Sequence, residues 1–141
     1  MLKKSTIFFI CILSLFVQNC GFLDFWSNRK HEIRKSYYDN GSLEYKSSYY
    51  NDKLDGPSSH YNVDGILLSY AEYENGNSHG LWKTFYNTGE LKYSCEYFHG
   101  NKHGEEKYYY NNGQTQSLIK YDYGKEINKI IRWDKNGDLL Y

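Results

Sequence analysis

Glycine recurs at an interval of 24 residues along most of this chain, with no insertion or deletion between copies. The glycines in this phase are Gly41, Gly65, Gly89, Gly113 and Gly137. A fixed period of this length is typical of repeat proteins, in which one supersecondary unit packs against the next. The period therefore constrains the fold more than any other feature of the sequence.

Within each unit, apolar and aromatic residues alternate with polar ones. Counted from the repeat glycine as position zero, the even positions from +2 to +8 are mostly apolar or small, and the odd positions between them are mostly polar. Tyrosine is frequent at +4 and +8, where the sequence has Tyr45, Tyr49, Tyr73, Tyr93, Tyr97 and Tyr121. Alternation with period two predicts a half-buried β-strand, whereas a helix would space its apolar residues three and four apart.

Two further sets of glycines mark positions within the unit, at +11 and +15. They are Gly76, Gly100 and Gly124 in the first set, and Gly56, Gly80 and Gly104 in the second. A glycine at +11 predicts a hairpin turn that needs a positive φ angle, and Asp52 takes this place in the first unit. One unit is therefore predicted to be a β-hairpin followed by a second turn at the repeat glycine.

Stacking these hairpins predicts an all-β fold, an elongated single antiparallel sheet of about ten strands. The register begins with half a unit at residues 31–38 and ends in the middle of a strand at Tyr141. A lone hairpin is marginal in water, so stability has to accumulate along the array. The two terminal strands leave unpaired edges, which favour binding of a partner or self-association.

Residues 1–19 have the features of a signal peptide. Lys3 and Lys4 precede an uncharged apolar run over residues 7–17. The run is shorter than the roughly 20 residues that span a bilayer, but its length suits the apolar region of a secretory signal. A buried helix is the alternative. Residues 17–21 (VQNCG) resemble a bacterial lipobox, which predicts lipid attachment at Cys20; a leader followed by an incidental cysteine is the other interpretation.

These features divide the chain into a signal peptide (1–19), a lipid-attachment cysteine with a tether (20–36) and a hairpin-repeat domain (37–141). The expected location is the cell envelope, with the protein anchored to the membrane by lipid, in the outer membrane if the organism has one. A secreted or periplasmic protein is the alternative. Cys95 would be the one remaining thiol in the mature domain, so no internal disulfide is expected.

Residues 86–92 (YNTGELK) and 97–104 (YFHGNKHG) resemble the bacterial variant of the MORN repeat, and the same pattern recurs through most of residues 37–141. The resemblance implies a β-hairpin array that works as a scaffold or a binding surface, in some cases linked to membranes or lipids. Some bacterial members are labelled antitoxins. The first and last copies depart most from the pattern, as expected for capping units.

No metal ion or cofactor is expected. Cys95 and His99 are four residues apart on an extended strand, about 13 Å, and ligands of one ion have to converge much more closely. His79 and His103 share a phase in successive units, so two strands separate them by roughly 9–10 Å. We expect these histidines to cap turns instead.

The sequence also predicts that the protein is not an enzyme. Neighbouring residues of a strand point to opposite faces, so Ser58, Ser59 and His60 do not form a nucleophile with an oriented base. Glu72 and Glu96 recur at +7 and are expected to be solvated. Nucleic acid is not an expected partner either: without Lys3 and Lys4, 15 basic side chains stand against 17 acidic ones, with no basic face to bind phosphates.

The 17 tyrosines exceed what a small apolar core requires. They either pack between strands and units or line an exposed surface, since tyrosine is favoured at interfaces. The candidate residues for such a binding surface are Tyr45, Tyr49, Tyr73, Tyr93, Tyr97 and Tyr121. The expected function is a non-enzymatic, envelope-anchored scaffold that binds an unidentified protein partner or the membrane. The alternatives are an antitoxin or immunity protein, and a protein that binds cell-wall glycan through the tyrosines.

Overall fold

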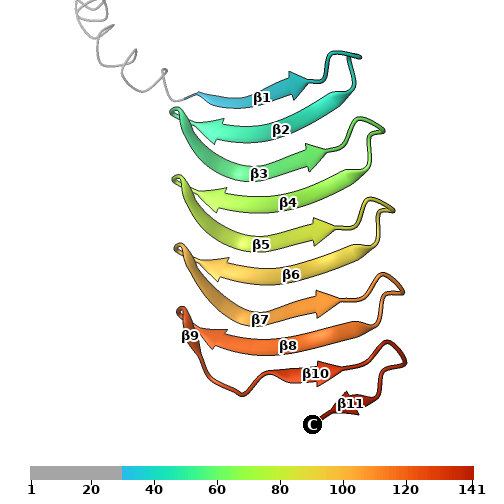
Figure 1. Cartoon of the computed structure of the whole chain (residues 1–141). Coiled ribbons are helices and arrows are strands. Elements are labelled where there is room, and N and C mark those ends of the chain that lie inside the picture. The colour runs from blue at the N-terminus through green and yellow to red at the C-terminus, as the bar shows by residue number, and fades with distance from the viewer. Residues whose placement is uncertain (1–29) are drawn as a thin grey trace, which may run out of the picture. The chain divides into compact units, whose positions relative to one another are not determined.

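A computed structural model describes residues 30–141, which form one open antiparallel sheet (Figure 1). The predictions for residues 1–29, including the leader and Cys20, lie outside the described residues. The strands are β1 (His31–Tyr37), β2 (Leu43–Tyr50), β3 (Lys53–Tyr61), β4 (Leu67–Glu74), β5 (Asn77–Phe85), β6 (Leu91–Phe98), β7 (Asn101–Tyr109), β8 (Thr115–Asp122), β9 (Lys125–Glu126), β10 (Ile131–Trp133) and β11 (Leu139–Leu140). The predicted all-β fold of stacked hairpins is confirmed.

The strand order in the sheet follows the order in the sequence, from β1 to β8 and then β10 and β11. The two-residue strand β9 pairs with β8 beside this path, so the sheet has eleven strands where about ten were predicted. The difference arises in the last unit, where Asn128 replaces the glycine at +15. There the strand beside β8 is interrupted: β9 pairs with Tyr121 and Asp122 at one end of β8, and β10 pairs with Ser117 and Leu118 further along it.

The sheet begins six residues earlier than the predicted boundary between tether and repeat domain. β1 pairs with β2 from His31 opposite Tyr50 to Tyr37 opposite Leu43. Residues 31–36, which the division of the chain assigned to the tether, therefore belong to the strand expected from the half unit at residues 31–38, and residues 31–141 form one compact unit. β1 forms backbone hydrogen bonds with β2, so β1 and not β2 is the edge strand of the sheet.

The hairpin turns have two central residues, both with positive φ. In the turn between β4 and β5, φ is 51° at Asn75 and 87° at Gly76. This backbone is that of a type I′ turn, whose twist matches the twist of the flanking strands. The positive φ predicted for the glycine at +11 is confirmed. The residue before this glycine, at +10, has a positive φ as well. That position holds Asn51, Asn75, His99 and Tyr123.

The glycines at +15 form bulges in the middle of the hairpins. Gly80 has a φ of +88°, and the pairing of β4 with β5 shifts register at this point. The Glu72 carboxylate accepts a hydrogen bond from the Leu81 backbone N–H at 2.7 Å and another from the Tyr70 hydroxyl at 2.6 Å. Glu72 thus provides the hydrogen-bond acceptor for a backbone N–H group of the bulge, and the expectation that it is merely solvated is wrong. Its pKa is lowered, first by the Tyr70 hydrogen bond and then by that of Leu81.

The connecting turns at the repeat glycines close in the same way in each unit. At Gly89, the glycine N–H donates to the Tyr86 carbonyl at 2.9 Å, and the Tyr86 N–H donates to the Glu90 carbonyl at 2.8 Å. The Tyr86 hydroxyl then donates to the Tyr109 carbonyl of the next unit at 2.7 Å. A side chain therefore links one connecting turn to the next.

The described part of the chain is a single layer, so few of its side chains are fully buried. Only Cys95, Glu106 and Ser117 are, at 1%, 2% and 7% exposure. Most other strand residues are half-buried and pack against neighbours within the layer. Within residues 30–141, no helix is long and apolar enough to cross a membrane.

Candidate interaction surface

One side of the sheet carries the tyrosines predicted as binding residues, and we call it the tyrosine face. Residues directly opposite each other on antiparallel strands share a face. By this pairing the tyrosines at +8 stand opposite the bulge glycines: Gly56 faces Tyr73, Gly80 faces Tyr97 and Gly104 faces Tyr121. A glycine has no side chain, so the opposing ring covers its backbone. This alternation produces a row of half-buried rings across the hairpins, with Tyr49 at the first hairpin.

Further side chains fix the rings of this row. The Trp82 ring lies between Tyr73 and Tyr97, with ring centroids 6.1 Å and 5.0 Å away. The Arg34 guanidinium lies 4.2 Å from the centre of the Tyr49 ring, and the Lys102 ammonium lies 5.0 Å from that of Tyr121. Aromatic and cation–π contacts of this kind hold rings in place in a layer that has no deep core.

A second row of aromatic side chains lies nearer the connecting turns. Tyr45 stacks on His60 with ring centroids 4.2 Å apart, and Tyr93 packs against Tyr108 at 4.9 Å. Tyr45 and Tyr108 are 43% and 40% exposed. The tyrosines are therefore partly packed and partly exposed, and each of the two interpretations offered from the sequence describes some of them.

A buried carboxylate lies between the two rows. Glu106 accepts hydrogen bonds from the Tyr93 hydroxyl at 3.0 Å and from the Lys102 ammonium. Burial, more than any other cause, raises the pKa of Tyr93 well above its usual value. Burial alone would lower the pKa of Lys102, but the hydrogen bond and charge of Glu106 outweigh it and the pKa is raised. The Tyr93 hydroxyl and the Lys102 ammonium thus keep their protons at neutral pH.

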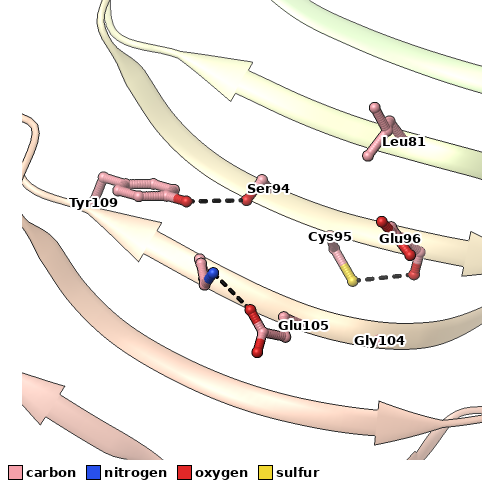
Figure 2. A pocket seen from close by; sticks show the side chains of 8 residues that line it. Leu81, Ser94, Cys95, Glu96, Gly104, Glu105 and Tyr109 are labelled. Atoms are coloured by element: carbon pink, nitrogen blue, oxygen red, sulfur yellow. Dashed lines mark hydrogen bonds and ion pairs between the residues drawn. The ribbon is translucent and has the colours of Figure 1, made fainter.

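A shallow pocket of about 350 Å³ lies among β5, β6 and β7, as Figure 2 shows. The Ser94 and Tyr109 hydroxyl oxygens are 3.4 Å apart at one end of it, and the Cys95 thiol donates to the Glu96 carbonyl at 3.3 Å. Burial raises the pKa of the Cys95 thiol, so it is protonated at neutral pH and is a poor nucleophile. The pocket has no activated group for covalent chemistry.

The structure places His103 and the pair His79 and His99 in different surroundings, which the sequence did not predict. Cys95 is buried in β6, and the group of possible metal ligands found within residues 30–141 does not include it. The Tyr123 N–H approaches the His103 Nδ1 at 3.5 Å, consistent with the predicted turn-capping role. However, His79 and His99 lie close to Glu74, with ligand atoms of all three residues within 4.8 Å of one another. The sequence analysis compared residues in one phase or on one strand, whereas these come from different phases of adjacent units.

Three segments of the chain match the family described as MORN repeat variant: residues 33–52, 78–99 and 102–123. Each of these segments includes one connecting turn, at Gly41, Gly89 or Gly113, and ends within the hairpin turn that follows. No curated protein and no solved structure matches the chain. The repeat family predicted from the sequence is therefore confirmed for these three segments.

Proposed function

Because three segments of this chain match the MORN repeat variant, we propose that it is a non-enzymatic scaffold that binds a protein partner through its tyrosine face. The observation that carries this proposal is a broad aromatic surface left partly open on a single-layer sheet. Tyr45 and Tyr108 are exposed, and the row formed by Tyr73, Trp82 and Tyr97 is only half-buried. Tyrosine and tryptophan are enriched in protein interfaces, where their rings supply contact area and their polar atoms supply hydrogen bonds.

The polar groups of the face favour recognition over catalysis. The pKa values of Tyr73 and Tyr121 are raised, mainly by burial, that of Tyr121 to about 12. Their hydroxyls are therefore hydrogen-bond donors at neutral pH rather than bases. Such a face suits a partner that presents backbone carbonyls or other acceptors beside apolar side chains.

The binding proposal is tested by affinity capture from an envelope extract with the full-length chain as bait. Tyr45→Ser combined with Tyr108→Ser removes two exposed rings, and it should abolish retention of the partner that the wild type captures. Tyr123→Ser is the matched control, because Tyr123 is 61% exposed in a hairpin turn and its ring packs against Phe98, which directly follows Tyr97 in β6 and therefore points away from the tyrosine face. A partner retained equally by all three proteins would contradict binding through the tyrosine face.

We further propose that Cys20 anchors the scaffold in the cell envelope by an attached lipid. The support is the apolar run at residues 7–17 and the lipobox-like residues around Cys20. Radiolabelled palmitate should enter the wild type and not Cys20→Ala. Label in Cys20→Ala, or none in the wild type, would exclude this anchor while leaving the binding proposal intact.

The same capture experiment distinguishes the two alternatives. A captured toxin, neutralised by the wild type and not by the double tyrosine variant, would specify an antitoxin or immunity protein. Retention on purified cell-wall glycan, with no protein captured, would favour glycan binding instead. Of the three, the protein scaffold is favoured because the exposed rings of the face are tyrosines, which are enriched in protein interfaces.

A further inference from the structure

The three residues Glu74, His79 and His99 lie together where two hairpins meet. Glu74 is the last residue of β4, His79 lies in β5, and His99 is in the turn between β6 and β7. The Gly100 N–H donates to the Ser78 carbonyl at 2.8 Å, and this backbone bond sets the position of one turn against the next. The cluster is therefore held by the stacking of the repeats.

The distances in the cluster suit a tetrahedral metal ion. Glu74 Oε2 lies 3.3 Å from His79 Nδ1 and 3.5 Å from His99 Nδ1. Zinc bonds to nitrogen and oxygen ligands are about 2.0–2.1 Å long, which places tetrahedral ligands roughly 3.4 Å apart. The carboxylate oxygen is thus already at the separation that zinc requires from both imidazoles. A small rotation of the exposed His99 ring would bring the third pair of ligand atoms, which are within 4.8 Å, to the same value.

His79 supplies independent support. Its Nδ1 atom is buried and has no hydrogen-bond partner within the described residues, although a carboxylate oxygen is near. A buried polar atom without a partner is unfavourable, and a metal ion would satisfy its lone pair. Phe98 packs against both rings, with centroids 5.2 Å from His79 and 4.3 Å from His99. The imidazoles are thereby positioned before any ion arrives.

Solvent reaches the cluster from one side. The side chains of Glu74 and His99 are 48% and 61% exposed. An ion could enter from solution, and a fourth coordination position would remain for water. Two imidazoles and one carboxylate are ligands that zinc accepts, whereas magnesium and calcium favour oxygen ligands alone.

The equivalent positions at the other junctions are occupied differently. At the preceding junction the Asn75 N–H donates to the Asp55 carboxylate at 3.0 Å. At the following one Phe98, His103 and Tyr123 form an aromatic cluster, with His103 and Tyr123 centroids 4.9 Å apart. Only the junction between them, among residues 30–141, brings three metal-ligating side chains together.

The geometry points to a zinc site formed by Glu74, His79 and His99, which binds one Zn²⁺ ion and fastens two consecutive repeats to each other. Each repeat contributes ligands, so the ion bridges hairpins that are otherwise joined by backbone hydrogen bonds and ring contacts. This inference does not depend on the tyrosine face or on its partner.

Zinc titration of the tag-free, full-length chain by calorimetry tests the site. The wild type should bind about one Zn²⁺ per chain, and zinc should raise its thermal midpoint. Glu74→Gln and His99→Asn should each weaken binding at least tenfold and remove the thermal shift. His99→Asn keeps the turn, because Asn75 occupies the same turn position in the preceding repeat. Co²⁺ should give the visible absorption of a tetrahedral ion in the wild type and in neither of these two variants.

His103→Ala is the matched control, since His103 occupies in the next repeat the position of His79. It should bind zinc as the wild type does. Absence of stoichiometric binding by the wild type would overturn the inference. An equal loss in His103→Ala and in Glu74→Gln would overturn it as well, because binding would then be spread over the surface histidines.

Discussion

The hairpin turns and the connecting turns lie at opposite ends of the strands (Figure 1), and they link successive repeats by different means. At the hairpin turns the backbone makes the link: the N–H groups of Gly76, Gly100 and Gly124 donate to carbonyls of the preceding unit at 2.7–2.8 Å. At the connecting turns a side chain makes it: the hydroxyls of Tyr38, Tyr86 and Tyr110 donate to carbonyls of the following unit.

The difference explains where the repeats vary. Tyrosine recurs at the connecting turns because its hydroxyl is part of the link. Where Asn62 replaces it, the side chain closes its own turn instead, accepting from the Asp64 and Ile66 N–H groups. At the hairpin turns the residue before the glycine takes no part in the backbone link, so Asn75, His99 and Tyr123 can differ. The variable residues, and with them the proposed zinc site, gather at the end where the backbone makes the link.

Replacing glycines should give the largest effects, and one replacement in each kind of turn tests whether the left-handed backbone is equally strained in both. Gly100→Ala and Gly89→Ala should each lower the free energy of unfolding by about 1–2 kcal/mol, the usual cost of left-handed backbone for a residue with a side chain. An added Cβ meets nothing closer than 4.0 Å at either site, so the φ angle alone decides. Urea denaturation measures the change.

Gly80→Ala provides a comparison at a site where the added Cβ has no room. Its Cβ would overlap the Glu72 carboxylate and displace it from the Leu81 N–H that it caps, so the loss should exceed that of either turn variant. A much larger loss for Gly100→Ala than for Gly89→Ala would contradict the equivalence of the two turns.

Removing one hydroxyl should separate the two ends of the strands. Tyr86→Phe deletes the bond to the Tyr109 carbonyl and should cost about 1 kcal/mol, a typical net contribution of one hydrogen bond. Tyr123→Phe at a hairpin turn should cost almost nothing, because its hydroxyl makes no hydrogen bond within the described residues and its side chain is 61% exposed. Equal losses in thermal or urea denaturation would contradict the contrast between the ends.

The bulge midway between the turns should give the smallest effect, a dependence of stability on pH. Because the folded protein lowers the pKa of Glu72, the ionised carboxylate contributes stability above the ordinary glutamate pKa of about 4.3. That contribution should be lost as the pH falls through the lower pKa of the folded state. Thermal midpoints of wild type and Glu72→Gln should converge in this acid range, and parallel curves would contradict the role of Glu72.

The repeat period was sufficient to predict the fold because each glycine phase corresponds to one backbone requirement. Gly76 and Gly89 predict turns directly, and the alternation of tyrosines predicts which side chains share a face. The bulge at Gly80 was not predicted, because its support is a carboxylate on the neighbouring strand. The positive φ of Tyr123 was missed because a bulky residue rarely adopts it. That of His99 was missed because only the glycine of each turn was considered.

The proposed zinc site could not be predicted by comparing equivalent positions of the repeats. Its residues stand at +9 and +14 of one unit and at +10 of the next, so they meet only when the hairpins are stacked in register. A search for metal-ligating residues across adjacent turns, once the hairpin register is assigned, would have found Glu74, His79 and His99 together.

The strand order that follows the chain has a consequence for how this domain folds and unfolds. Each strand gains its partner from the adjacent stretch of sequence, so loop closure is short and the contact order is low. Opening can start at an end and proceed one hairpin at a time, as in other linear arrays. The two-residue strand β11 and the three-residue strand β10 hold the C-terminal end by the shortest pairings. Amide hydrogen exchange should therefore be fastest there and slow progressively toward β6 and β7.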